Sequence, residues 1–193
     1  LISRYLGQSL YTWTGIISVV LAGIAAGNYI GGRVADRRHG PGTLAVQFLL
    51  AAAVCLSMLV LNRIAGESGV LLNLSWPGRI LAHITITFLL PAMLLGTISP
   101  VIVKRALITR PAAGRAIGGV YAWATAGSIL GTFVTGYYLI MWMRATTVTV
   151  AAAAGLACVG MIYAVGALYA RATAQEAGPA PAVPRAETAR WRR

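Results

Sequence analysis

Carboxylate side chains are the first residues to consider, because general acid–base catalysis and cation transport both commonly depend on them. The 193-residue chain has four, Asp36, Glu67, Glu176 and Glu187, and none lies within its long apolar segments. One histidine, His83, does lie in such a segment. We expect it to form a hydrogen bond to backbone or headgroup near the outer interface rather than to relay protons.

Signatures of cofactor or metal binding are also missing from the sequence. The glycines around residues 114–119 do not form a G-x-G-x-x-G pattern after a strand, and there is no P-loop, C-x-x-C or H-E-x-x-H. We therefore predict no catalytic residue, no cofactor site and no metal site, which argues against an enzyme. The sequence leaves open whether a lipid or a pigment fills grooves between its elements.

One polar segment is distinctive enough to suggest a role: residues 32–40 have the sequence Gly-Arg-Val-Ala-Asp-Arg-Arg-His-Gly. The helix macrodipole opposes a carboxylate at a helix C-terminus. We therefore expect Asp36 to pair with an arginine or with the N-terminus of a neighbouring helix. Such an ion pair would latch two helices together, which makes Gly32, Asp36 and Arg37 candidates for a loop latch. The alternative is a plain cluster of charges that stops membrane insertion.

The elements that position these residues are apolar. Hydrophobic residues make up 58% of the chain and charged residues 10%, against about 25% charged residues in a soluble domain. Five charge-free intervals each exceed the roughly 20 residues that a helix needs to cross a bilayer. The sequence predicts an all-α integral membrane protein with a membrane domain at 1–171 and a disordered cytoplasmic tail at 172–193. The five transmembrane helices are expected at about 9–32, 43–61, 80–103, 116–143 and 145–170.

The net charge of +12 would favour a nucleic-acid partner in a soluble chain, but the positions of the basic residues favour the positive-inside rule. We therefore predict no nucleic-acid partner, a bacterial inner-membrane location and a cytoplasmic C-terminus. On this topology the outer side carries Arg4, Arg63, Arg79 and Arg144. The cytoplasmic side carries the other twelve, Arg33, Arg37, Arg38, Lys104, Arg105, Arg110, Arg115, Arg171, Arg185, Arg190, Arg192 and Arg193.

Small residues recur at helical spacing in two of the predicted spans. Such spacing lets another helix approach closely. Pro91 is expected to kink the third span, because it removes one backbone donor. Spans four and five are expected to form a tight hairpin, since only a short turn separates them. The helix-packing candidates are Gly23, Gly27 and Gly31 in the first span and Gly127 and Gly131 in the fourth.

Longer motifs resemble the membrane domain of fused spermidine synthase-like proteins over about residues 1–140. The motifs are Ser-Leu-Tyr-Thr-Trp-Thr at 9–14, Gly-Asn-Tyr-Ile-Gly-Gly-Arg-Val-Ala-Asp-Arg at 27–37, Leu-Gly-Thr-Ile-Ser-Pro at 95–100, Gly-Arg-Ala-Ile-Gly-Gly-Val-Tyr-Ala-Trp at 114–123 and Gly-Ser-Ile-Leu-Gly-Thr-Phe-Val-Thr-Gly at 127–136. The Asp36 segment also resembles the cytoplasmic loop motif of the major facilitator superfamily, with His39 where that motif usually has glycine.

The resemblance implies a partial major-facilitator-like helical bundle. In the family, this domain precedes a soluble Rossmann-type aminopropyltransferase domain. The segment after Arg171 lacks the glycine-rich loop and paired carboxylates of that domain, and a helix expected before Leu1 is absent. The resemblance therefore points to the membrane module alone and not to spermidine synthase activity.

Three functions are compatible with these observations. We expect a non-catalytic membrane subunit or anchor that packs against other helices in a larger complex. One alternative is a half-transporter of major-facilitator-like type that acts as an oligomer, and another is the membrane part of a split aminopropyltransferase. The expected partners are membrane lipids and either other membrane subunits or further copies of the chain.

Overall fold

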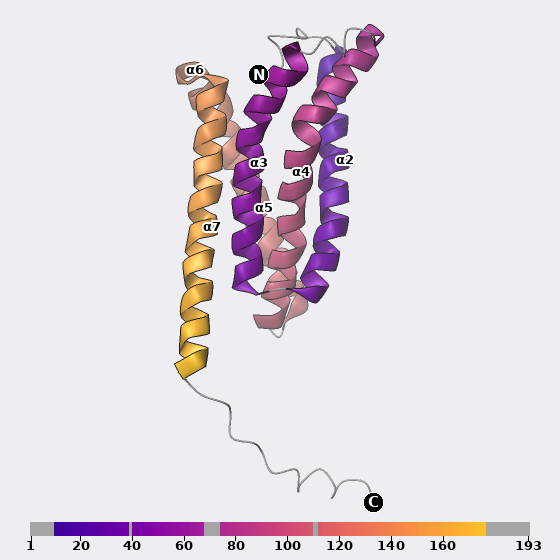
Figure 1. The fold of residues 1–193 in the computed structure, drawn as a ribbon. Helices are drawn as coiled ribbons and strands as arrows, with labels where there is room; N and C mark the ends of the chain where they lie inside the picture. Colours follow the sequence, from indigo (N-terminus) through magenta and orange to yellow (C-terminus); the bar gives the residue numbers. More distant parts are fainter. Residues whose placement is uncertain (1–9, 39, 68–73, 110–111, 177–193) are drawn as a thin grey trace, which may run out of the picture.

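The structure, a computed structural model, describes residues 10–38, 40–67, 74–109 and 112–176, and these form helices joined by short connections (Figure 1). Five of the helical stretches are long and apolar enough to cross a membrane, which confirms the predicted all-α fold with five candidate spans. Most of the predicted tail, residues 177–193, lies outside the described part of the chain. The elements are α2 (Leu10–Arg37), α3 (Pro41–Glu67), α4 (Trp76–Thr109), α5 (Ala113–Phe133), the π-helical segment η2 (Val134–Leu139), α6 (Ile140–Trp142) and α7 (Ala145–Glu176).

The helices extend beyond the bounds predicted from the apolar runs. Helix α2 continues through Asp36 to Arg37, and α4 continues past Lys104 to Thr109. Helix α7 ends at Glu176, so the first residues of the predicted tail are helical. The charged residues show where a helix can leave the hydrocarbon, but the backbone hydrogen bonds of a helix do not depend on apolar side chains and continue past that level.

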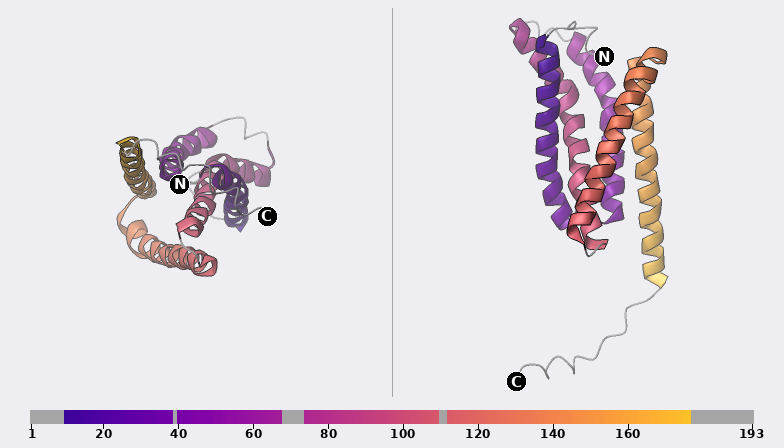
Figure 2. Two further views of the ribbon diagram at one scale, coloured as in Figure 1. Left: turned by 90° about the horizontal axis from the view of Figure 1, so that it is seen from below. Right: turned by 180° about the vertical axis from the view of Figure 1, so that it is seen from behind.

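Four of the helices pack side by side in the order α2, α4, α3, α7 (Figures 1 and 2). Helix α4 therefore lies at the centre, with α2 and α3 against it, and α7 covers the far side of α3. Helix α5 contacts α4 near the connection between them and otherwise lies apart from this row, as the view from below shows (Figure 2).

The prediction of a tight hairpin between the fourth and fifth spans is wrong. The connection is short, with Met143 in an extended conformation, but α5 and α7 do not pack along their lengths. Helix α7 instead packs its small residues against α3. A Cβ atom at Gly160 would lie 2.9 Å from the Leu49 side chain, and Tyr163 stacks on Phe48 with 5.8 Å between ring centroids.

The contact between α2 and α4 depends on the first glycine ladder. The residues of α2 that are buried are Thr12, Val19, Gly23, Gly27, Gly31 and Ala35, which share one face. A Cβ atom at Gly27 would overlap the Met93 carbonyl oxygen, and one at Gly31 would lie 2.6 Å from the Thr97 carbonyl oxygen. Only glycine lets the two backbones approach this closely.

Two apolar clusters fill the remaining space on either side of α4. Val19 of α2 packs with Ile80 and Ile84 of α4 in the half where α4 begins. In the other half, residues of α2, α3 and α4 pack together, with Leu156 and Tyr163 of α7 at the edge; the buried members are Ala35, Leu44, Ala51, Ile98 and Val101. These clusters pack α4 against α2 and α3.

Replacing Gly27 by leucine should separate α2 from α4, because the new side chain would overlap the α4 backbone, which can move only with the whole helix. We expect a loss of about 1–3 kcal/mol of folding free energy, measured as a lower Tm of the detergent-purified protein. Gly32→Leu is the matched control, because it lies on the same helix and a Cβ atom there has nothing within 4 Å. Equal Tm values for the two variants would contradict the packing argument.

Candidate functional site

The carbonyl oxygen of Thr97 lies where α2, α3 and α4 meet. It is the atom that approaches Gly31 of α2, and it also accepts a hydrogen bond of 3.2 Å from Nε2 of Gln47 on α3. The Thr97 hydroxyl donates to the Leu94 carbonyl of its own helix at 2.7 Å. One backbone atom of α4 therefore contacts both neighbouring helices, and both Gln47 and Thr97 are buried.

A second polar contact joins α3 to α4 toward the opposite end of these helices. His83 is 1% exposed and its Nε2 donates to Oδ1 of Asn62 at 3.1 Å. This contact is to a side chain, and the expected hydrogen bond from His83 to backbone or headgroup stays a prediction. The contact forms because α3 runs beside α4, so an amide side chain covers the imidazole.

The hydrogen bond between Asn62 and His83 should contribute measurably to stability, because both side chains are buried. Replacing Asn62 by leucine removes an acceptor from a buried imidazole N–H, at a cost of about 1–3 kcal/mol. Thermal unfolding in detergent measures this cost. Ser57→Ala is the control on the same helix, because that hydroxyl only returns to the Val54 carbonyl; an equal loss in both variants would contradict the assignment.

The loop latch joins α2 to α4. Lys104 Nζ donates to Asp36 Oδ1 at 3.0 Å, and the two side chains are 42% and 73% exposed. The prediction that Asp36 pairs with an arginine or a helix N-terminus is wrong, because its partner is Lys104. Helices α2 and α4 both end on this side of the bundle, which brings Lys104 next to Asp36. Gly32 has open space around it, and Arg37 is exposed.

The second glycine ladder has no partner among the described residues. A Cβ atom at Gly127 or at Gly131 would meet nothing within 4 Å. In the described part of α5, only Ala116 is buried. A shallow groove nevertheless follows the small-residue face, lined by Ser128, Gly131, Thr132, Thr135, Gly136 and Ile140. The two ladders look alike in sequence, but among the described helices only the first meets a neighbour.

Pro91 is buried inside α4, which continues as a helix on both sides of it. Its ring nitrogen has no hydrogen, so the Thr87 carbonyl lacks its usual helical donor. The Thr87 hydroxyl is buried too and has no hydrogen-bond partner among the residues described. Pro91 directly precedes Ala92, whose methyl group contacts Gly23. The kink itself stays a prediction.

Side chains that could bind a metal ion do not gather in the described ranges. No set of three or more His, Cys, Asp or Glu side chains in residues 10–38, 40–67, 74–109 or 112–176 is placed to hold a metal ion. The arrangement instead supports helix association, through one glycine ladder that is occupied and one that is open.

The amides that connect the helices by hydrogen bonds were not predicted from the sequence, because the candidate residues were acids, histidines and glycines. Gln47 and Asn62 are single amide side chains inside an apolar helix. An amide at membrane depth needs an internal partner, and this signal was present in the sequence.

No family model, no curated protein and no solved structure matches the chain.

Proposed function

We propose that this chain is a non-catalytic membrane subunit or anchor that binds other membrane helices through α5. One observation carries the proposal. Among the described residues of α5, η2 and α6, only Ala116 is buried, although the same stretch bears the small-residue groove around Gly131.

The composition of this groove distinguishes it from a surface made for lipid. Lipid-facing helix surfaces carry bulky apolar side chains, whereas Gly, Ser and Thr gather where membrane helices touch. Gly127, Gly131 and Thr135 are four residues apart, and Ser128, Thr132 and Gly136 form a parallel row beside them. Both lines of small residues lie on a part of α5 and η2 that none of the described helices α2, α4, α3 and α7 covers.

The π-helical segment supports the same role. Residues 134–139 form one wide turn between α5 and α6, and π-helical turns frequently occur at functional sites. Tyr137 and Tyr138 in this turn are exposed, as is Trp142 after it. Aromatic side chains at the end of a span anchor it at the membrane interface, so the open face of α5 is held at a defined depth.

We propose a bacterial inner-membrane location with the C-terminus in the cytoplasm, and the charge distribution supports this orientation. The described basic side chains gather where α2 and α4 end and α3 and α5 begin. We call this the basic end; the opposite end carries Arg63, Arg79 and Arg144. The positive-inside rule assigns the richer end to the cytoplasm. The basic end consists of Arg33, Arg37, Arg38, Lys104, Arg105 and Arg115.

Replacing Gly131 by leucine should weaken assembly without unfolding the chain, because its Cβ position is open within the structure. Loss of a close contact of about 1–2 kcal/mol corresponds to roughly tenfold weaker association. The measurement is the fraction of protein in the assembled band on a native gel after extraction in mild detergent.

Gly166→Leu on α7 is the matched control for this experiment. It makes the same change in an exposed helix position with nothing within 4 Å, but it lies away from the α5 groove. Wild type and Gly166→Leu should migrate as an assembly, and Gly131→Leu as the single chain. A wild-type protein that extracts as a lone chain would overturn the proposal.

The half-transporter is the second candidate, and the ion pair between Asp36 and Lys104 favours it. This pair joins two helices at one membrane surface by an exposed contact that costs little to break. A contact of this kind can open and close during alternating access. The relation to fused spermidine synthase-like proteins, and a split aminopropyltransferase with it, rests on the sequence motifs and stays a prediction.

If the chain transports a solute, Asp36→Asn should abolish uptake while leaving Tm nearly unchanged, because an exposed pair contributes only about 0.2–1 kcal/mol. Proteoliposomes with radiolabelled polyamines, amino acids and sugars provide the measurement. Glu67→Gln is the control, since it removes an exposed pair within α3, with 4.0 Å between Arg63 Nε and Glu67 Oε1. Absence of uptake by the wild type would exclude this candidate for the solutes named.

A further inference from the structure

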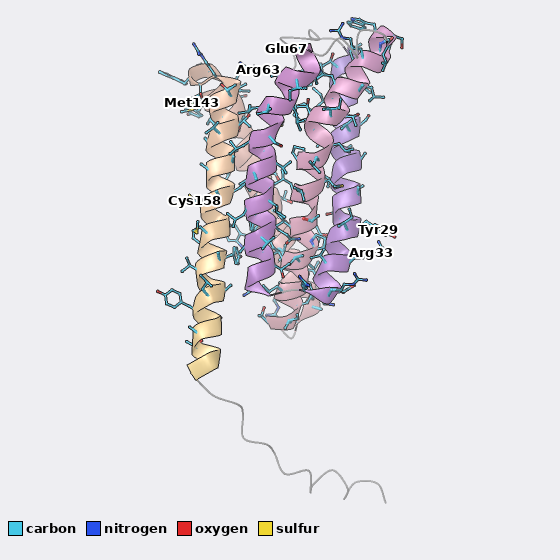
Figure 3. All side chains as sticks on the ribbon, viewed as in Figure 1. Tyr29, Arg33, Arg63, Glu67, Met143 and Cys158 are labelled. Atoms are coloured by element: carbon cyan, nitrogen blue, oxygen red, sulfur yellow. The ribbon has the colours of Figure 1, made fainter. Side chains whose placement is uncertain are left out.

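The basic end carries positive charge that the described carboxylates do not balance. Asp36 and Glu67 are the acidic residues whose side chains the structure describes, and Glu67 lies at the opposite end of α3 (Figure 3). Asp36 is already paired with Lys104 at 3.0 Å. The described arginines of this end, Arg33, Arg37, Arg38, Arg105 and Arg115, form no ion pair with a described carboxylate.

Two of these arginines lie next to the latch residues in sequence. Arg37 follows Asp36 on α2 and Arg105 follows Lys104 on α4, and the 3.0 Å contact between Asp36 and Lys104 places these two helix ends side by side. Arg105 is half-buried, and its Nη1 has no contact with solvent and no hydrogen-bond acceptor among the described residues. A guanidinium in this state favours a nearby anion, and phosphate oxygens match its geometry.

A helix N-terminus adds to the positive potential. Helix α5 begins at this end, and no side chain caps its first turn. Its free amide groups and the positive end of its dipole face the same membrane surface as the arginines. This observation supports an anion near the start of α5 but would not define a site without the arginines.

We propose that the basic end binds the phosphate of an anionic phospholipid between the end of α2 and the end of α4. The arginines lie at the ends of apolar helices, at the level where headgroups lie, and each cation near the surface favours an anionic lipid. An exposed apolar side chain, Ile30 of α2, lies on the membrane side of the arginines and provides a surface for an acyl chain.

The outward face of α2 extends the same surface. The Arg33 guanidinium lies over the Tyr29 ring at 3.8 Å from its centroid, and both side chains extend from α2 on the side away from α3 (Figure 3). An exposed aromatic ring and cation at this depth are typical of an interfacial anchor. A free anion in solution would gain nothing from Ile30 or from the Tyr29 ring, so the structure favours a lipid over a soluble anion.

The test uses the full chain, delipidated in detergent, and titrated with phosphatidylglycerol, phosphatidylcholine or inorganic phosphate while lipid adducts are counted by native mass spectrometry. Wild type should prefer phosphatidylglycerol. The double variant Arg37→Gln with Arg105→Gln should bind it roughly 30-fold more weakly, since each cation contributes about fivefold at the surface.

The control is Arg63→Gln with Arg144→Gln, which removes the same charge from the opposite end (Figure 3 labels Arg63) and should leave binding unchanged within about twofold. Arg38→Gln with Arg115→Gln, at two exposed positions, should also weaken binding and serves if the first variant fails to fold. Equal loss in the control, no preference for phosphatidylglycerol, or equal binding of inorganic phosphate would overturn the proposal. These outcomes do not depend on assembly through α5.

Discussion

The close approach of the α2 backbone to the α4 backbone is the constraint on which the rest of the bundle depends. Inside a bilayer, apolar side chains gain little by leaving lipid for protein, so helix association relies on close packing and on polar contacts. Gly27 and Gly31 supply the packing, because their missing Cβ atoms leave room for the Met93 and Thr97 carbonyl oxygens. The Thr97 carbonyl oxygen also contacts a second helix, α3, because it accepts a hydrogen bond from Gln47.

The central place of α4 has consequences for the outer helices. With α2 on one side and α3 on the other, α4 is the most buried of the five spans, and α7 packs on α3. Helix α5 is left with a contact near its start and an open small-residue groove beyond it. The same physical rule that makes Gly27 a packing residue within the chain thus makes Gly131 a candidate for packing between chains.

The basic end combines a weak ion pair with the strong positive potential of its arginines. The ion pair between Asp36 and Lys104 is largely exposed and adds little to stability, but it aligns the ends of α2 and α4 and leaves the neighbouring arginines without a described carboxylate. Such an arrangement suits a surface that meets charged headgroups. Lipid binding at this end and helix binding at α5 use separate residues, so the two can be tested independently.

The sequence by itself determined the five spans, the concentration of basic residues at one end and the two faces of small residues, because each follows from composition and spacing along a single helix. It also contained the amides Gln47 and Asn62, whose burial could have been inferred from their apolar surroundings. Only the tertiary structure decided which face was occupied, that Lys104 rather than an arginine meets Asp36, and that α7 packs on α3 rather than on α5. Those outcomes depend on helices far apart in the chain, such as the contact between Asp36 and Lys104 across 68 positions, and helical periodicity carries no information about which helix lies next to which.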